Sequence, residues 1–197
     1  YHLKPGTKIG GKYGTKIAFN ASMYQSVGDS LNLLKMGDTK YFSDVNLEIK
    51  KKWNKKLETT LGLQKIFYNA SVIQAVSEGQ IDAQIIALGA IYKITPKKSI
   101  RTKFEHLSTQ QDKKNWVSGL AEISWSSPYA VYCSDLYNYG DTKNHYYNFG
   151  ASVTKSSTRF ALGFGKQRAG LFCVGGVCRF VPASYGFTAT LTTSFSN

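Results

Sequence analysis

The chain is poor in proline, methionine and cysteine, and it lacks a long apolar run. Its 197 residues include 4 Pro, 2 Met and 3 Cys, against 13 Tyr and 11 Phe. Because no apolar stretch approaches the roughly 18 residues that a membrane helix needs, helical membrane spans are excluded. A membrane barrel stays possible, since its strands give a much weaker hydropathy signal. Abundant Tyr, Thr, Ser and Gly favour strands and turns, so we expect an all-β domain.

Recognisable catalytic and metal-binding motifs are also missing. His2, His106 and His145 have no Cys, Asp or Glu at metal-ligand spacing. Nucleophile-elbow, phosphate-loop and zinc-protease patterns do not occur. Asp135 and Asp141 flank a tyrosine-rich stretch that an ordinary polar loop explains. We therefore expect a protein that is not an enzyme and that has no catalytic residues, no metal and no cofactor.

Acidic residues are scarce, with 12 Asp and Glu against 25 Lys and Arg, so the formal charge is +13. The lysines sit in short clusters at predicted turns or loops: Lys50, Lys51, Lys52, Lys55 and Lys56; Lys97 and Lys98; Lys113 and Lys114. No nucleic-acid motif presents this charge. The pattern indicates solvated basic turns and no nucleic-acid partner.

Most of the chain alternates apolar and polar residues with the two-residue period of a strand. The last stretch, 186–195, is the clearest case, with Phe187, Ala189 and Leu191 apolar and small polar residues between them. About eleven strands are predicted: up to Ile9, then 16–23, 44–50, 57–64, 81–87, 100–105, 117–125, 129–137, 146–153, 159–164 and 186–195.

Two predicted strands are less regular. In 81–87 the alternation assigns Ile81, Ala83, Ile85 and Ala87 to one face and Asp82 and Gln84 to the other, and it blurs beyond Ile86. This strand is therefore expected to be covered on both faces for part of its length. The facing of 129–137 cannot be assigned from the pattern.

Connections alternate in length along the chain. Short turns near Gly11, Asn54, Pro96, Ser127 and Ser156 alternate with longer loops near Gly28, Ser77, Gln110, Asp141 and Cys178. Outer-membrane barrels have short periplasmic turns and longer extracellular loops. The pattern predicts an antiparallel transmembrane β-barrel, although a soluble barrel with an inward apolar face stays open.

The polar faces of the predicted strands carry charge. Four cations are predicted to line the lumen: Lys16, Arg101, Lys103 and Arg159. The opposite faces are apolar and aromatic, which suits lipid. Phe187, Leu191 and Phe195 would form the terminal strand and its insertion signal, with Phe195 at the headgroup region.

The strand number predicts an incomplete barrel. Bacterial single-chain barrels have an even number of strands, and both ends normally lie on the short-turn side. Eleven strands, with the start on the long-loop side, predict at least one further strand upstream. Tyr1 is not an initiator Met, and no signal peptide follows, which also indicates a mature form or a fragment. Residues 1–197 are expected to form the C-terminal part of a single barrel domain.

The sharpest local motif is 173–178, Cys-Val-Gly-Gly-Val-Cys. The two glycines suit a two-residue hairpin turn in which both positions need positive φ. Cys173 and Cys178 would then lie directly opposite, with their Cα atoms about 4.5 Å apart, within disulfide range. A disulfide is the favoured interpretation and fits an oxidising compartment; a metal site or free thiols are the alternatives.

Three segments carry a resemblance to a known family: 135–140 (Asp-Leu-Tyr-Asn-Tyr-Gly), 145–148 (His-Tyr-Tyr-Asn) and 173–184, which contains the paired cysteines. The sequence resembles the C-terminal region of a Bacteroidota family of predicted outer-membrane barrel proteins without an assigned function. The resemblance is clearest from about Ser99 onward. It implies a longer protein in the outer membrane of a Gram-negative bacterium and transfers no catalytic residues.

Two functions are expected on this basis. The first is a scaffold or accessory subunit of a cell-surface outer-membrane complex, whose long loops contact other outer-membrane or surface proteins. The second is a passive pore for small solutes, with its lumen cations favouring anions. In either case the partners include outer-membrane lipid and, during insertion, the barrel-assembly machinery. A soluble sandwich is a third possibility.

Overall fold

The structure is a computed structural model that describes residues 2–3, 6, 11–28, 36–73, 79–111, 113–125, 128–174 and 177–194. For 170–174 and 177–181 it describes the backbone. The predicted Phe195 and the two glycines of the cysteine motif lie outside these ranges, as does most of the first predicted strand.

The described chain is almost entirely antiparallel β-structure, which confirms the predicted all-β class. An eleven-stranded sheet has the order β1 to β10 followed by β13, and ten of its strands have ten or more residues. The strands of this sheet are β1 (His2–Leu3), β2 (Thr15–Val27), β3 (Met36–Lys52), β4 (Leu57–Asn69), β5 (Gln80–Thr95), β6 (Lys98–Thr109), β7 (Trp116–Trp125), β8 (Tyr129–Asn138), β9 (His145–Lys155), β10 (Thr158–Gln167) and β13 (Ser184–Thr193).

Two small elements accompany the sheet. The helix α1 (Ala70–Ile73) begins the connection between β4 and β5, where the alternation predicts only a loop. The strands β11 (Gly170–Val174) and β12 (Val177–Val181) pair with each other as a separate two-stranded hairpin between β10 and β13. No helix in the described ranges has the length and apolar character to cross a membrane.

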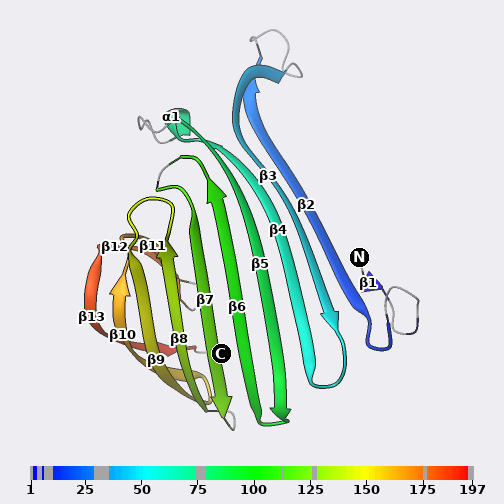
Figure 1. The fold of residues 1–197 in the computed structure, drawn as a ribbon, viewed down its shortest axis with the longest axis vertical. Coiled ribbons are helices and arrows are strands. Elements are labelled where there is room, and N and C mark those ends of the chain that lie inside the picture. The colour runs from blue at the N-terminus through cyan, green and yellow to red at the C-terminus, as the bar shows by residue number, and fades with distance from the viewer. Residues whose placement is uncertain are drawn as a thin grey trace.

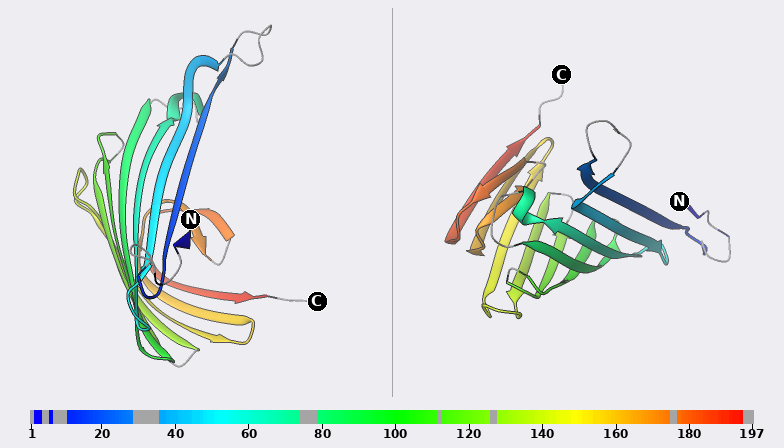
Figure 2. Two further views of the ribbon diagram at one scale, coloured as in Figure 1. Left: turned by 90° about the vertical axis from the view of Figure 1, so that its right-hand side faces the viewer. Right: turned by 90° about the horizontal axis from the view of Figure 1, so that it is seen from above.

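The sheet is a curved wall with unlike ends. Long connections gather at one end of the strands and tight turns at the other (Figure 1). We call these the long-loop end and the short-turn end. Seen from above, the strands from β2 to β13 trace an arc that does not close (Figure 2). The sheet is therefore open, with β13 at one edge and, at the other, the two-residue β1 along the outer side of β2.

Register divides the side chains into two faces, because directly opposed residues of neighbouring strands point to the same side of a sheet. One face carries Ile49, Leu61, Leu88 and Phe104 as a row across β3 to β6. The adjacent row, on the other face, contains Lys50, Thr60, Gly89 and Lys103. The register also assigns β8, placing Tyr129, Val131 and Cys133 on the apolar face.

The predicted facing of 81–87 is wrong relative to the rest of the sheet. Ala83, Ile85 and Ala87 oppose Thr109, Leu107 and Glu105, so they lie on the polar face. Ile86 and Leu88 occupy the apolar face instead. The physical reason is that the polarity of each face changes along the strands. At the long-loop end the polar face becomes apolar around Trp116, which is 5% exposed.

Candidate functional site

The apolar face of the wall is exposed. Among the described residues the buried hydrophobic side chains are Ala70, Ala83 and Trp116, whereas large apolar side chains from nearly every strand are open to the surroundings. Those on the apolar face include Phe19, Met23, Val45, Leu63, Ile86, Leu88, Phe104, Val131, Phe149, Phe160, Leu162, Phe187 and Leu191. Folding therefore leaves these groups for something else to cover.

This apolar surface stops at a polar border toward the long-loop end. Lys65 pairs with Asp82 at 3.7 Å, and His145 pairs with Asp135 at 2.6 Å, on the same face. By register, Lys65 on β4 is level with Ser108 on β6, and Asp135 on β8 is level with Phe104 on β6. Residues 104 and 108 are four apart, so the border lies four residues closer to the short-turn end on β8 than on β4.

A second border runs along the short-turn end. Lys51 on β3 is level with Thr102 on β6, four residues above Lys98. Lys98 is level with Val153 on β9, two residues above Lys155. This border therefore drops by six residues over six strands. At about 3.3 Å per residue and about 4.8 Å per strand, both borders are inclined by roughly 35° to the direction perpendicular to the strands, which is the angle by which the strands tilt if the borders are horizontal.

The two parallel borders enclose a band of even height, which we call the apolar band. On β6 it extends from Lys98 to His106, and on β9 from Lys155 to Tyr147, the partner of Asp135. Each span covers eight residues, about 26 Å along the strand and roughly 22 Å perpendicular to the borders.

Aromatic residues mark both margins of the apolar band. At the short-turn end Trp53, Tyr92, Trp125 and Tyr129 are exposed. At the long-loop end Tyr137 stacks on His145 with ring centroids 4.0 Å apart, and Tyr147 meets Tyr185 edge to face at 6.3 Å. Tyr and Trp have an apolar ring and a polar group, so they suit the boundary between an apolar layer and water.

The opposite face is concave and polar. A hollow of about 920 Å³ is lined from β6, β7, β8, β9, β10 and β13 together, which only the inside of a curved sheet allows. Register places all four predicted lumen cations on this face: Lys16, Arg101, Lys103 and Arg159. Two of them, Arg101 and Arg159, line the hollow.

The concave hollow carries more cations than acids. Lys103 pairs with Glu105 at 2.7 Å, and Arg159 donates a hydrogen bond to Ser152 Oγ at 3.4 Å. Within the hollow, Arg101, Arg159, Lys166 and Arg168 face a single acid, Glu122. Lys166 and Arg168 lie over the rings of Tyr146 and Trp116 at the long-loop end. The hollow therefore has a positive balance that favours anions.

Asn138, which was not predicted from the sequence, holds two of the long loops together. Its side chain is fully buried. It donates to the carbonyls of Lys113 and Asn115, and accepts from the backbone amides of Asp141 and Thr142. One amide thus joins the β6–β7 loop to the β8–β9 loop. An Asn at the end of a strand, followed by Tyr-Gly-Asp-Thr, was the available signal for such a turn.

The hairpin β11–β12 has the predicted register, with Cys173 opposite Cys178 and Val174 opposite Val177. Their side chains lie outside the described part of the chain, so the disulfide stays a prediction. Cys133 is a free, exposed cysteine on β8. Phe187 and Leu191 project from β13 on the convex side, 88% and 69% exposed. Within the described ranges no three metal-ligating side chains cluster.

Comparison with known protein families identifies the chain's family. A family of unknown function, DUF6029, matches residues 1–195. Searches of curated proteins and of solved structures found no significant match. Because the match covers nearly the whole chain, this protein belongs to the DUF6029 family.

Proposed function

We propose that this wall is part of an outer-membrane β-barrel whose apolar band contacts lipid hydrocarbon. The observation that carries the proposal is the pair of parallel polar borders on the convex face. Their slope of roughly 35° agrees with the strand tilt of roughly 35–45° in membrane barrels. The height of roughly 22 Å is close to their apolar band of about 25 Å. A surface made for a protein partner has no reason to keep this tilt and height across most of the sheet.

The distribution of charge supports the same proposal. A soluble barrel or sandwich would turn its apolar face inward around a core. Here the inward face carries Lys16, Arg101, Lys103 and Arg159, and the outward face is apolar. A lipid environment reverses the usual arrangement, because the solvent outside is then apolar and the water is inside.

The open edges support a larger barrel. In hydrocarbon each unsatisfied backbone group costs several kcal/mol, so a membrane sheet has to be closed. Within the described residues no strand pairs with the outer side of β13 or with the outer side of β2 from Ala18 to Val27. We infer that further strands complete the barrel, with the short-turn end in the periplasm and the long-loop end outside.

Within such a barrel we propose a scaffold or accessory role in a cell-surface complex. The long-loop end presents an ordered aromatic surface. Tyr139 stacks on His106 and hydrogen-bonds to it at 2.5 Å, and Tyr137 stacks on His145. Aromatic side chains supply much of the binding energy of protein interfaces. Because Asn138 holds this region in place, a partner would meet a preformed surface.

The three native tryptophans can test lipid contact. Trp53 and Trp125 lie at the margin of the apolar band, whereas Trp116 lies on the concave face and is 5% exposed. Variants that keep one Trp each, with Phe at the other two positions, would be reconstituted into bilayers with brominated acyl chains. We expect strong fluorescence quenching of Trp53 and Trp125 and little quenching of Trp116. Equal quenching of all three, or none, would overturn the proposal.

A pore for small anions is the second candidate, favoured by the positive balance of the concave hollow. Planar-bilayer recordings of the intact protein would separate the two functions. A pore predicts steady open steps with anion preference, and Arg101→Gln with Arg159→Gln should reduce that preference because it removes two lumen charges. Persistent silence would exclude the pore and leave the scaffold.

A further inference from the structure

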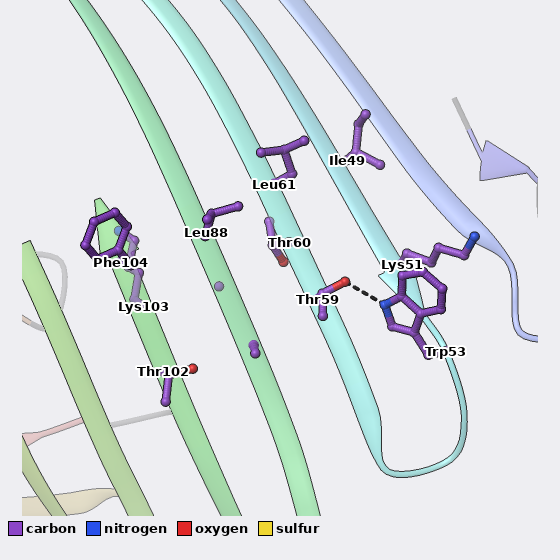
Figure 3. Close-up of a pocket in the computed structure, with 12 residues that line it drawn as sticks. Ile49, Lys51, Trp53, Thr59, Thr60, Leu61, Leu88, Thr102, Lys103 and Phe104 are labelled. Atoms are coloured by element: carbon purple, nitrogen blue, oxygen red, sulfur yellow. Dashed lines mark hydrogen bonds between the residues drawn. The ribbon is translucent and has the colours of Figure 1, made fainter. Parts of the chain in front are cut away.

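The apolar band contains a hollow of about 500 Å³ on its convex side, between β3 and β6 (Figure 3). Its floor is a row of small residues, Thr59, Ala90 and Thr102, directly opposed on β4, β5 and β6. The neighbouring row toward the long-loop end is large, with Leu61, Leu88 and Phe104. The hollow exists because a row of small side chains lies beside a row of large ones.

One end of the hollow is cationic. Lys51 lies with its Nζ 4.5 Å from the centre of the Trp53 ring, and both residues line the hollow. The Trp53 indole donates a hydrogen bond to Thr59 Oγ1 at 2.8 Å, which fixes the ring against the floor (Figure 3). The ring in turn holds the ammonium group at the border of the apolar band.

The described stretches around this end hold no acid on the same face as Lys51. In the stretches 50–58 and 92–103 the single acid is Glu58. It lies on the concave face, level with Lys52, and pairs with Lys50 at 3.5 Å. The turn after Trp53 adds Lys55 and Lys56, both exposed. A negatively charged group at this point would therefore meet several cations and no like charge.

The floor of the hollow also leads inward from the border of the apolar band. Lys51 lies at the border of the apolar band, but Thr102, level with it by register, lies four residues inside the band on β6. The floor therefore runs obliquely from the headgroup level toward the middle of the band. Its span from β3 to β6 is about 14 Å, which suits most of one acyl chain.

We propose that this hollow binds an anionic glycerophospholipid, with one acyl chain on the floor and the phosphate at Lys51 beside Trp53. The inference rests on the proposed membrane location. It adds a specific lipid, bound in the leaflet at the short-turn end, to the general lipid contact of the apolar band. Basic and aromatic side chains at a membrane border are a known combination for lipid headgroups.

Trp53 provides a reporter inside the proposed site. A variant with W116F and W125F would be reconstituted in phosphatidylcholine with a low fraction of brominated phosphatidylglycerol, and then with the same fraction of brominated phosphatidylcholine. We expect stronger quenching of Trp53 by the anionic lipid. Lys51→Gln should weaken the apparent affinity for that lipid about fivefold, the effect of one cation at a membrane surface. Ala90→Leu, which fills the floor, should also weaken it.

Matched controls use the same face away from the hollow. Lys155→Gln removes another border lysine, on β9, and Ala151→Leu enlarges an alanine of the apolar band that lies away from the hollow. Both variants should bind like the parent. Equal quenching by the two lipids, or unchanged affinity in Lys51→Gln and Ala90→Leu, would overturn the site. Quenching of a Trp125-only protein would still report lipid contact, so the membrane location is tested separately.

Discussion

Val131→Arg is expected to destabilise the protein in a bilayer by about 2–4 kcal/mol, the cost of a cation on the lipid face of a membrane barrel near the bilayer midplane. Val131 lies on the convex face between Ile123 and Ala151. It is four residues from Asp135 at the border of the apolar band and 38% exposed. The measurement is urea unfolding in phospholipid bilayers, followed by the fluorescence of the native tryptophans.

Ser134→Arg is the matched control on the same strand. Ser134 lies on the concave face and lines the hollow of about 920 Å³, so an arginine there has room and, in the proposed lumen, water. Its cost should stay below about 1 kcal/mol, as for substitutions at solvated polar positions away from a packed core. Equal destabilisation by the two arginines, or a neutral Val131→Arg, would contradict lipid contact at the middle of the apolar band.

Asn138→Ala is expected to cost about 2–4 kcal/mol and to release both neighbouring loops. The substitution removes the side-chain partner of the Lys113 carbonyl and of the Asp141 and Thr142 amides, whereas the Asn115 carbonyl keeps the Gly140 amide as a partner. Buried polar groups left without a partner cost about 1–3 kcal/mol each, and water entering the loops will recover part of this. Hydrogen exchange should increase in the β6–β7 and β8–β9 loops together, because the Asn138 side chain bonds to both and its loss leaves the bond from the Gly140 amide to the Asn115 carbonyl between them.

Two further variants sharpen this test. Asn138→Asp keeps the acceptor for Asp141 and Thr142 but loses both donors, so it should release the β6–β7 loop more than the β8–β9 loop. Asn144→Ala is the control. The backbone carbonyl of exposed Asn144 accepts a hydrogen bond from the backbone N–H of Asn138 at 3.0 Å, and the substitution leaves that carbonyl in place. An increase in hydrogen exchange that is confined to the β8–β9 loop of the Asn138→Ala variant would contradict the proposed link between the loops. If the scaffold function is right, Asn138→Ala should also weaken partner binding.

Much of the wall could be predicted from sequence, because strand alternation is a local property with a period of two. The pattern in 186–195 is sufficient to place Phe187 and Leu191 on one face, and the register of β10 with β13 agrees. The same reasoning placed the hairpin of Cys173 and Cys178, since Gly-Gly specifies a tight turn. It was wrong for 81–87, where apolar residues occupy both faces and alternation contains no information about which side is concave.

The sequence by itself determined the strands, the facing of most of them and the alternation of short and long connections, since each depends on neighbouring residues. The tertiary structure decided everything that depends on register between strands. Lys51, Lys98 and Lys155 form one border only when β3, β6 and β9 are aligned, and Thr59, Ala90 and Thr102 form one floor for the same reason. Distances between residues far apart in sequence are set by pairing, which no local pattern encodes.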